Sequence, residues 1–370
     1  MQVTREQVIA YRIGAQQLDR SARSANALAV LDIGVQDFAV HPALLSFDAR
    51  LAAPPKPSGI GPGTSIALTW SLRGAPHLHR RRDLDALAGA LWPLSEQDAA
   101  GRLNETGPSV ARAGISALDQ WLTALDAMRA VVSTPTAKGA ASTEVTRRIP
   151  KAMRHNCRAC KTAHISDSAM RTVALAAGLE IEPNTYPPVL LPRPKARPVD
   201  APDVRALRRL VIAYLTLLGP AAPADVAGYF EVRAADLKQA WPDDLTEVHV
   251  DGKKAWLPAA AADQLARARP KDVVRLLGPF DPYLQARDRD VIVPDKAAHK
   301  TLWPVLGRPG VLFVDGEVVG AWRPKASGTK LTLTVEAFAP LPESAWRRVD
   351  TEAGRVAAVR GATDVTVVRA

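Results

Sequence analysis

The chain has 370 residues, a length that predicts roughly two to four domains rather than a single core. Its formal net charge of +10 favours a polyanionic partner, because basic side chains that meet phosphates release condensed counterions. Two cysteines cannot build a disulfide-rich secreted framework, and the chain has no run of about 18 apolar residues that would predict a membrane span. We therefore expect a globular, cytoplasmic, monomeric protein that associates with double-stranded DNA of the nucleoid.

The N-terminal region predicts a first winged-helix domain over residues 1–105. Thr4 followed by Gln7 resembles a capping box that opens a helix running to about Leu18. Further helices are expected over Ala25–Leu31 and Pro42–Leu51, and the strand-like segments Ile66–Ser71 and His77–Arg82 predict a wing and its exit into a helix that begins at Asp83.

The second of these strands supplies the first candidate DNA contacts. His77 and His79 alternate along a strand and so share one face, which Arg73 is expected to share. Such side chains can contact a phosphate or a damaged base; alternatively, the imidazoles satisfy neighbouring backbone groups. With the following basic residues, the predicted DNA-binding set here is Arg73, His77, His79, Arg80 and Arg81.

Residues 106–200 predict a second, basic winged-helix-like domain. Helices are expected over Val110–Val132, Ser142–Arg154 and Ser166–Gly178, then a strand over Leu179–Glu182 and a stiff proline-rich linker over 187–202. Residues 138–200 hold eleven Lys or Arg against five Asp or Glu, a difference of +6. This excess predicts phosphate contacts by Arg147, Arg148 and Lys151, although an Arg-rich composition without a DNA role would also produce it.

The same region contains the metal-ligand residue types His155, Cys157, Cys160 and His164. Two thiols and two imidazoles are ligands that zinc prefers, which makes a structural zinc site one interpretation. Zinc fingers usually separate their ligand pairs by about a dozen residues, and four ligands within one turn are sterically demanding. The preferred interpretation is that the cysteines pack against neighbouring residues or are incidental thiols. A redox role is weaker, because no thioredoxin-like strand and helix precede the motif. We therefore expect no metal or other cofactor.

Residues 201–270 predict a third winged-helix domain. Apolar residues from Leu207 to Leu218 recur at helical spacing, and a short second helix follows over Ala222–Phe230. A third helix is expected from Ala234 to Trp241, and Asp251-Gly252 predicts a tight hairpin turn. Lys253 and Lys254 at the hairpin tip are candidate phosphate contacts, although a winged helix used only for packing would carry the same pattern.

From residue 271 to 370 the hydrophobic period changes to two, which predicts a β-rich domain. Val311–Val314, the turn Asp315-Gly316 and Glu317–Gly320 form a second hairpin signal, and apolar residues alternate with polar ones from Leu331 to Glu336. The complete prediction is an α+β protein with tandem winged-helix (helix-turn-helix) domains followed by a C-terminal β-barrel-like domain.

The order of four segments resembles the winged-helix DNA glycosylases of the AlkZ and YcaQ type. These segments are Val35–Asp37, Trp70–His77, Phe280–Arg289 and the hairpin with Val318–Gly320. The resemblance covers most of the chain and implies excision of alkylated or cross-linked bases from DNA. It also implies a catalytic Gln-x-Gln or Gln-x-Asp motif beginning at Gln36.

The candidate catalytic residues are Gln36 and Asp37. In this sequence the acid is adjacent to the glutamine, and Phe38 holds the third position of the motif. Hydrolysis of an N-glycosidic bond passes through an oxocarbenium-like state, which a carboxylate stabilises while it or a glutamine positions water. The alternative is a polar pair at a helix C-terminus and turn, which short Asp-containing segments commonly form.

The leading functional hypothesis is therefore a DNA-repair glycosylase-like enzyme that hydrolyses the N-glycosidic bond of alkylated bases. The alternative is a non-catalytic winged-helix DNA-binding or regulatory protein, which the Phe38 departure favours. Nucleotide-dependent chemistry is not supported, because the glycine-rich segment Gly59–Gly63 lacks a following lysine and Pro62 removes an amide donor.

Overall fold

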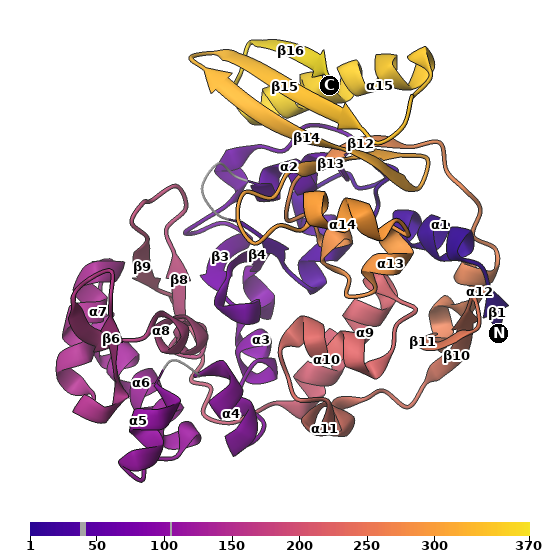
Figure 1. The fold of residues 1–370 in the computed structure, drawn as a ribbon. Coiled ribbons are helices and arrows are strands. Elements are labelled where there is room, and N and C mark those ends of the chain that lie inside the picture. The colour runs from indigo at the N-terminus through magenta and orange to yellow at the C-terminus, as the bar shows by residue number, and fades with distance from the viewer. Residues whose placement is uncertain (38–41, 104–105) are drawn as a thin grey trace. The chain divides into compact units, whose positions relative to one another are not determined.

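The computed structural model describes residues 1–37, 42–103 and 106–370, and Figure 1 shows its elements along the chain. It is a mixed α+β structure that separates into two compact units. Unit 1 contains residues 1–57, 212–226 and 243–370, and unit 2 contains residues 58–211 and 227–242. The four sequence-based domain boundaries stay a prediction. Within the described ranges, no helix has the length and apolar character that a membrane span requires.

The C-terminal part of unit 1 is an open sheet covered by a long helix. Its five strands follow the order β12-β13-β14-β15-β16, so within the described residues the first and last strands do not pair and the predicted barrel does not close. The elements are β12 (Val274–Leu277), β13 (Gly310–Val314), β14 (Glu317–Ser327), β15 (Lys330–Ala337), α15 (Glu343–Val359) and β16 (Asp364–Arg369).

The helix α15 explains why this sheet stays open. It joins β15 to the parallel strand β16, and its apolar residues Trp346, Val349 and Val356 pack on the sheet. The facing residues include Leu331 and Leu333, which confirms the predicted alternation along β15. Because the helix covers the apolar face, the sheet need not curl on itself to bury it.

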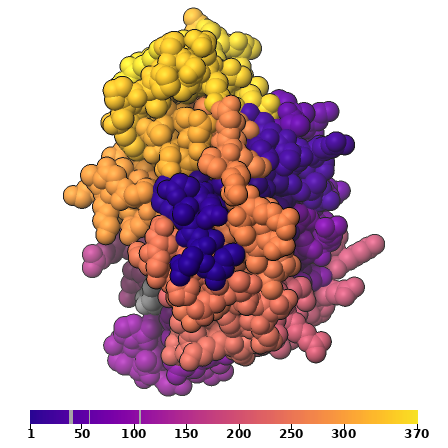
Figure 2. Space-filling model, turned by 90° about the vertical axis from the view of Figure 1, so that its right-hand side faces the viewer, coloured from indigo at the N-terminus to yellow at the C-terminus, as the bar shows by residue number. Residues whose placement is uncertain are grey.

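A second, three-stranded sheet in unit 1 joins the start of the chain to the hairpin predicted at Asp251-Gly252. The strands β1 (Gln2–Val3), β10 (Leu245–Val250) and β11 (Lys253–Pro258) are hydrogen-bonded in that order. Asp251 and Gly252 both have positive φ, 47° and 82°, as the predicted tight turn requires. Figure 2 shows the indigo N-terminal residues on the surface against the orange segment that contains these strands.

The remaining helices of unit 1 are short and surround this framework. They are α1 (Arg5–Ala15), α2 (Pro42–Asp48), α12 (Ala262–Ala266), α13 (Arg289–Ile292) and α14 (Lys296–Leu302). Thr4 caps α1, and the reciprocal bond from Gln7 confirms the predicted capping box. All seven residues of α2 are buried.

Buried ion pairs hold the segment Phe280–Arg289 in unit 1. The Arg50 guanidinium donates to both carboxylate oxygens of Asp281 at 2.7 and 2.8 Å, and neither side chain is exposed. Arg12, also buried, pairs with Asp288 at 2.5 Å. These pairs explain why the segment Phe280–Arg289 has a fixed position in unit 1, which the sequence alone did not indicate.

Unit 2 contains an antiparallel sheet and a helical layer. Its strands run in the order β4-β3-β8-β9-β5, namely β4 (Pro76–Arg80), β3 (Ile66–Trp70), β8 (Leu179–Ile181), β9 (Val189–Pro192) and β5 (Thr136–Ala137). Its helices are α3 (Leu84–Ala90), α4 (Glu96–Arg102), α5 (Gly107–Arg112), α6 (Ala117–Val131), α7 (Lys138–Arg148), α8 (Asp167–Ala174) and α11 (Ala234–Leu237). The helices α9 (Val204–Leu218) and α10 (Pro223–Phe230) cross the boundary between the units.

A small hairpin interrupts the helical layer of unit 2. The strands β6 (Arg154–Cys157) and β7 (Thr162–Ile165) pair only with each other and lie between α7 and α8 in the chain. The predicted helix over Ser142–Arg154 is therefore wrong at its end. The helix α7 ends at Arg148, because Pro150 restricts the preceding residue, Ile149, to extended backbone.

Three further predicted elements differ from the structure. Ala25–Leu31 is not one α-helix but two short 3₁₀ turns, because Leu28 between them is extended. The predicted helix Val110–Val132 is divided into α5 and α6 around Gly114, whose φ is +68°. The proline-rich stretch 187–202 is not only a linker, since it contains the strand β9.

We predict that Asp281→Asn lowers the free energy of unfolding by about 3–5 kcal/mol, because the buried Arg50 charge loses its counter-charge. Urea unfolding followed by circular dichroism measures this loss. The matched control is Asp263→Asn, which removes the acid of the exposed pair with Arg267 and should cost less than about 1 kcal/mol. Equal effects of the two substitutions would contradict a structural role for the buried pair.

A second prediction concerns His77, whose ring is buried in β4 and whose Nδ1 is 2.9 Å from the Ala75 carbonyl oxygen. Burial, with the nearby charges of Arg73 and His79, lowers the pKa of His77 well below 6.5. The unfolded chain therefore binds a proton that the folded chain rejects, so stability is present above pH 6.5 and is lost as the pH falls.

Unfolding measurements from pH 7 to 5 should show a flatter pH dependence for His77→Asn than for the wild type. The difference should not exceed about 1.4 kcal/mol per pH unit, the limit for a single ionising group. His249→Asn is the control, because this half-exposed imidazole lies beside Glu247 in the other unit. Parallel curves for the wild type and His77→Asn would overturn the prediction.

Candidate functional site

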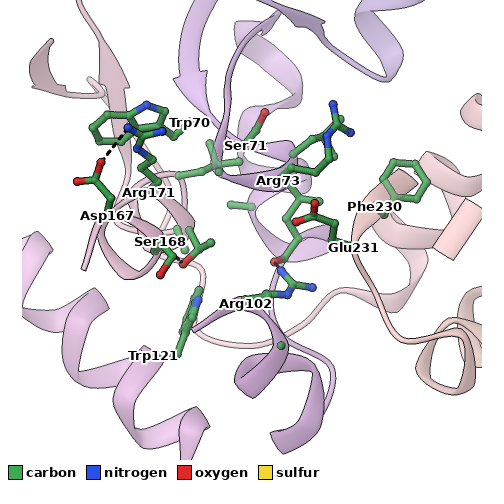
Figure 3. Close-up of a pocket in the computed structure, with 18 residues that line it drawn as sticks. Trp70, Ser71, Arg73, Arg102, Trp121, Asp167, Ser168, Arg171, Phe230 and Glu231 are labelled. Atoms are coloured by element: carbon green, nitrogen blue, oxygen red, sulfur yellow. Dashed lines mark hydrogen bonds and ion pairs between the residues drawn. The ribbon is translucent and has the colours of Figure 1, made fainter. Parts of the chain in front are cut away.

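Unit 2 contains a cavity of about 320 Å³. Six segments of the chain supply its walls: the end of β3 with the turn after it, α3 with the residue after it, the end of α4, the first half of α6, α8 with the residues after it, and the end of α10 with the residue after it. Figure 3 shows the labelled side chains around the cavity. Those that carry polar or aromatic groups are Trp70, Ser71, Arg73, Arg102, Trp121, Asp167, Ser168, Arg171, Thr172, Phe230 and Glu231.

Three arginines give this cavity its positive character. Arg73 donates from Nη1 to the Tyr229 carbonyl oxygen at 2.9 Å and lies over the Tyr229 ring. Arg102 pairs with Asp98 at 2.8 Å, one turn earlier in α4. Arg171 pairs with Asp167 at 2.9 Å and lies over the Trp70 ring, as Figure 3 shows. Each guanidinium is thus held in place by a neighbour.

The same side chains retain donors that are not used by the protein. Within the described part of the chain, Arg73 Nη2, Arg102 Nε, Arg171 Nε and Trp121 Nε1 are buried atoms without a hydrogen-bond acceptor. A buried donor without a partner costs about 1–3 kcal/mol, so native structures rarely tolerate several at one place. These four atoms are closed off from the cavity itself, so its ligand is indicated by the three arginine side chains that line it, which favour an anion.

Local backbone geometry positions the first of these arginines. Arg73 lies in the short turn Leu72–Gly74 between β3 and β4, and its φ is +57°, in the left-handed region. An arginine in that region is strained by its Cβ atom. Because Arg73 lies in this turn, it is not on the strand face that was predicted for it beside His77 and His79.

The predicted histidines are interior residues. His77 and His79 are 1% and 2% exposed, and their ring centroids are 6.0 Å apart, so they share one side of β4. His79 Nε2 lies 2.9 Å from the Ser71 hydroxyl, and Ser71 lines the cavity. The observed hydrogen bonds agree with the alternative in which these imidazoles satisfy neighbouring groups.

The next two predicted basic residues are also engaged within unit 2. Arg80 is buried and lies 3.8 Å from Asp83. Arg81 pairs with the buried carboxylate of Glu180 at 2.7 Å and donates to the Thr64 and Gly61 carbonyl oxygens. These contacts fix the end of β4 against the sheet.

The remaining predicted basic residues are exposed. Arg147, Arg148 and Lys151 lie at and beyond the end of α7, where Arg147 pairs with Glu144. Lys253 and Lys254 line a second cavity, in unit 1, of about 260 Å³. Four aspartates share that second cavity, namely Asp225, Asp251, Asp288 and Asp290, so it is less suited to phosphate than the cavity of unit 2.

The predicted catalytic pair lies in unit 1. Gln36 ends the short strand β2 (Val35–Gln36) and is partly exposed. Asp37 is 8% exposed, and its Oδ1 accepts from the Ala43 amide of α2 at 3.2 Å. The carboxylate therefore contacts the first turn of α2. Phe38, the third position of the motif, lies outside the described residues.

The four predicted metal-ligand residues are brought together only in part. Ligand atoms of Cys157, Cys160 and His164 lie within 4.8 Å of one another. The His155 ring centroid is 6.3 Å from that of His164. This cluster lies on the β6–β7 hairpin.

No sequence pattern links the residues of the unit 2 cavity. Arg102, Trp121 and Arg171 occur on three helices and were not predicted as site residues. The positive charge of residues 138–200 includes Arg171 but does not distinguish it from ten other basic residues. The grouping results from packing of α4, α6 and α8 against one another.

Comparisons with known proteins agree with this architecture. The chain is similar to the solved structure of the Streptomyces sahachiroi DNA glycosylase AlkZ, with a TM-score of 0.74 and 23% identity over all of both chains. It is 33% identical over 128 residues to an interstrand DNA cross-link repair glycosylase of Streptomyces sahachiroi. That match spans 34% of this chain and about a third (33%) of the relative.

The family described as "DNA glycosylase AlkZ-like" matches residues 62–359. This range contains every residue that lines the unit 2 cavity, whereas Gln36 and Asp37 precede it. The matched range includes most of the chain, and the chain therefore belongs to the AlkZ-like DNA glycosylase family.

Proposed function

We propose that this protein is a DNA-repair glycosylase that hydrolyses the N-glycosidic bond of alkylated bases in double-stranded DNA. The observation that carries the proposal is the cavity of unit 2 that three arginines line, in a chain whose family is the AlkZ-like glycosylases. A DNA phosphate supplies the acceptor oxygens and the negative charge that arginine side chains bind.

The element order of residues 117–192 supports a winged-helix arrangement in unit 2. The helix α6, strand β5 and helix α7 are followed by the β6–β7 hairpin, the helix α8 and the strands β8 and β9. The strands pair in the order β8-β9-β5. In a helix-turn-helix module the last helix reads or contacts DNA, and here that helix is α8, which carries Arg171.

The proposed chemistry uses Gln36 and Asp37. Water adds to C1′ of the deoxyribose as the bond to the base nitrogen breaks; the electron pair of that bond leaves with the base, and the added water loses one proton to solvent. An N7-alkylated purine is already positively charged, so its departure does not require a strong general acid. The Asp37 carboxylate would stabilise the positive charge that develops on the sugar, and Gln36 would position the water.

A second candidate function is DNA binding without catalysis. The bond between Asp37 Oδ1 and the Ala43 amide favours it, since this contact gives the carboxylate a structural role. The two candidates differ in the fate of the base, and one substitution separates them.

We predict that Asp37→Asn lowers the rate of N7-methylguanine release from duplex DNA at least about 100-fold at unchanged melting temperature. Asparagine retains the oxygen that accepts from Ala43 but removes the charge that stabilises the transition state. Single-turnover base release measures the effect, and Gln36→Ala should show a comparable loss. Asp32→Asn, at an exposed acid nearby, is the control.

The opposite outcome would identify a purely structural carboxylate. Asp37→Asn would then behave as the wild type, and Asp37→Ala would lose about 1 kcal/mol of stability with its helix contact. If the wild type releases no base from either N7-methylguanine DNA or an interstrand cross-linked duplex but still binds DNA, the non-catalytic function is correct. The cross-linked substrate is included because the name of the Streptomyces relative specifies it.

A further prediction tests the cavity directly. Arg171→Gln should weaken binding to a DNA duplex and reduce the slope of log affinity against log salt concentration by about 0.9, the value for one lost phosphate contact. Fluorescence anisotropy between about 50 and 200 mM salt measures both quantities. Asp167 keeps Lys138 as a partner at 2.9 Å in this variant, which limits damage to the fold.

Arg267→Gln is the matched control for that experiment. Arg267 also pairs with an aspartate four residues earlier in sequence, at 3.2 Å, but it is exposed and lies in unit 1. If both variants lose affinity equally, the loss reflects general charge and the cavity does not bind a phosphate.

A further inference from the structure

The β6–β7 hairpin has too little apolar burial to explain its own order. It is a two-stranded sheet, and among its eight strand residues only Ile165 is buried. An isolated two-stranded hairpin is marginally stable in water at best. Packing of β7 against α7 and the hydrogen bond from the Ile165 amide to Thr146 Oγ1 hold one strand of the hairpin, and the chemistry of the hairpin supplies a candidate for further stability.

The strand register brings the ligand residues to one side of the hairpin. His155 lies directly opposite His164, and Cys157 lies opposite Thr162. Directly opposite residues share a face, as do residues two apart along a strand, so His155, Cys157 and His164 project from the same face. Cys160 lies in the connecting turn, where Lys161 adopts a positive φ of 52°.

The three nearest ligand atoms approach the spacing of a tetrahedral metal site. The two sulfurs and the His164 nitrogen lie within 4.8 Å of one another. Zn–S and Zn–N bonds of about 2.3 and 2.0–2.1 Å would place tetrahedral ligand atoms about 3.5–3.8 Å apart. Closing the difference requires side-chain movements of about 1 Å, and Cys160 is exposed.

Hydrogen bonds leave the ligand atoms in the forms that a metal requires. His164 Nδ1 is 2.6 Å from the Ile165 carbonyl oxygen, so Nδ1 carries the proton and Nε2 presents a lone pair. That Nε2 is buried, and His164 also shares a side-chain hydrogen bond with Cys157, which holds the ring against the sulfur. The Cys160 amide donates to Cys157 Sγ at 3.4 Å, which stabilises negative charge on the sulfur. Both cysteines are free rather than joined in a disulfide.

We propose that Cys157, Cys160 and His164 bind one Zn²⁺ ion that holds the β6–β7 hairpin together, with His155 as the fourth ligand. Two thiolates and imidazole nitrogen form a soft donor set, which selects zinc over magnesium or calcium. The three ligands span eight residues of the sequence, and the hairpin brings them together by folding His164 back over the turn. With four protein ligands the site is structural, and it does not depend on the function proposed above.

The first experiment is elemental analysis of protein expressed without a polyhistidine tag and purified under reducing conditions. The proposal expects one zinc per chain, and loss of stoichiometric zinc in Cys157→Ser, Cys160→Ser and His164→Ala. Arg158→Ala, an exposed residue of the same turn, is the matched control and should retain the metal. The proposal is wrong if the wild type binds no zinc after reconstitution, or if the ligand variants bind zinc as tightly as Arg158→Ala.

A second measurement avoids variants that fail to fold. Hydrogen exchange of the wild-type chain is compared before and after zinc is removed by a chelator in the presence of a reductant. Faster exchange confined to residues 154–165 and reversed by added zinc supports the proposal; unchanged exchange there overturns it. His155→Ala tests the fourth ligand, because it should weaken zinc binding by at least the roughly 10–100-fold that loss of an outer-shell partner causes, without changing the stoichiometry. Unchanged affinity would show that His155 is not a ligand.

Discussion

The ion pair between Arg50 and Asp281 fixes the framework of unit 1. Both side chains are fully buried, and they are separated by 231 residues in the sequence. Arg50 also donates to Gln16, which in turn donates to the Leu217 carbonyl oxygen. Asp281 accepts from the Tyr283 amide as well. One guanidinium and one carboxylate thus determine where four distant segments meet.

Such a pair specifies a structure more than it stabilises one. Removing two charges from water costs several kcal/mol for each ion, and only close geometry and further hydrogen bonds offset that cost. Here the pair is bidentate, and three additional hydrogen bonds surround it. Any packing that separates the two residues would leave a buried charge without a partner, so alternative arrangements of these segments are strongly disfavoured.

Unit 2 places its arginines around a cavity instead. Each of the three cavity arginines is held by at least one hydrogen-bond or ion-pair partner, and Arg102 is held by two, Asp98 and the Leu91 carbonyl oxygen. Guanidinium groups fixed in this way are suited to charge-assisted hydrogen bonds with an anion. The β6–β7 hairpin likewise gathers Cys157, Cys160 and His164 at one place. The ligands proposed above, a phosphate and a zinc ion, would bind to groups that the fold has already brought together.

Local patterns were sufficient to predict the elements whose causes are local. The Thr4–Gln7 capping box, the turn at Asp251-Gly252 and the buried alternation along β15 each depend on residues close together in the chain. The sequence also carried the resemblance that the family match confirms. It determined the presence of the cysteine and histidine cluster, although not its geometry.

Only tertiary structure decided which side chains meet. Arg73 contacts Tyr229 from 156 residues away, and no periodicity encodes such a contact. The burial of His77 and His79, the opening of the C-terminal sheet and the grouping of the cavity arginines likewise depend on which elements pack together. The physical reason is range: caps, turns and strand alternation act over a few residues, whereas burial and pairing of charges depend on elements that only folding brings into contact.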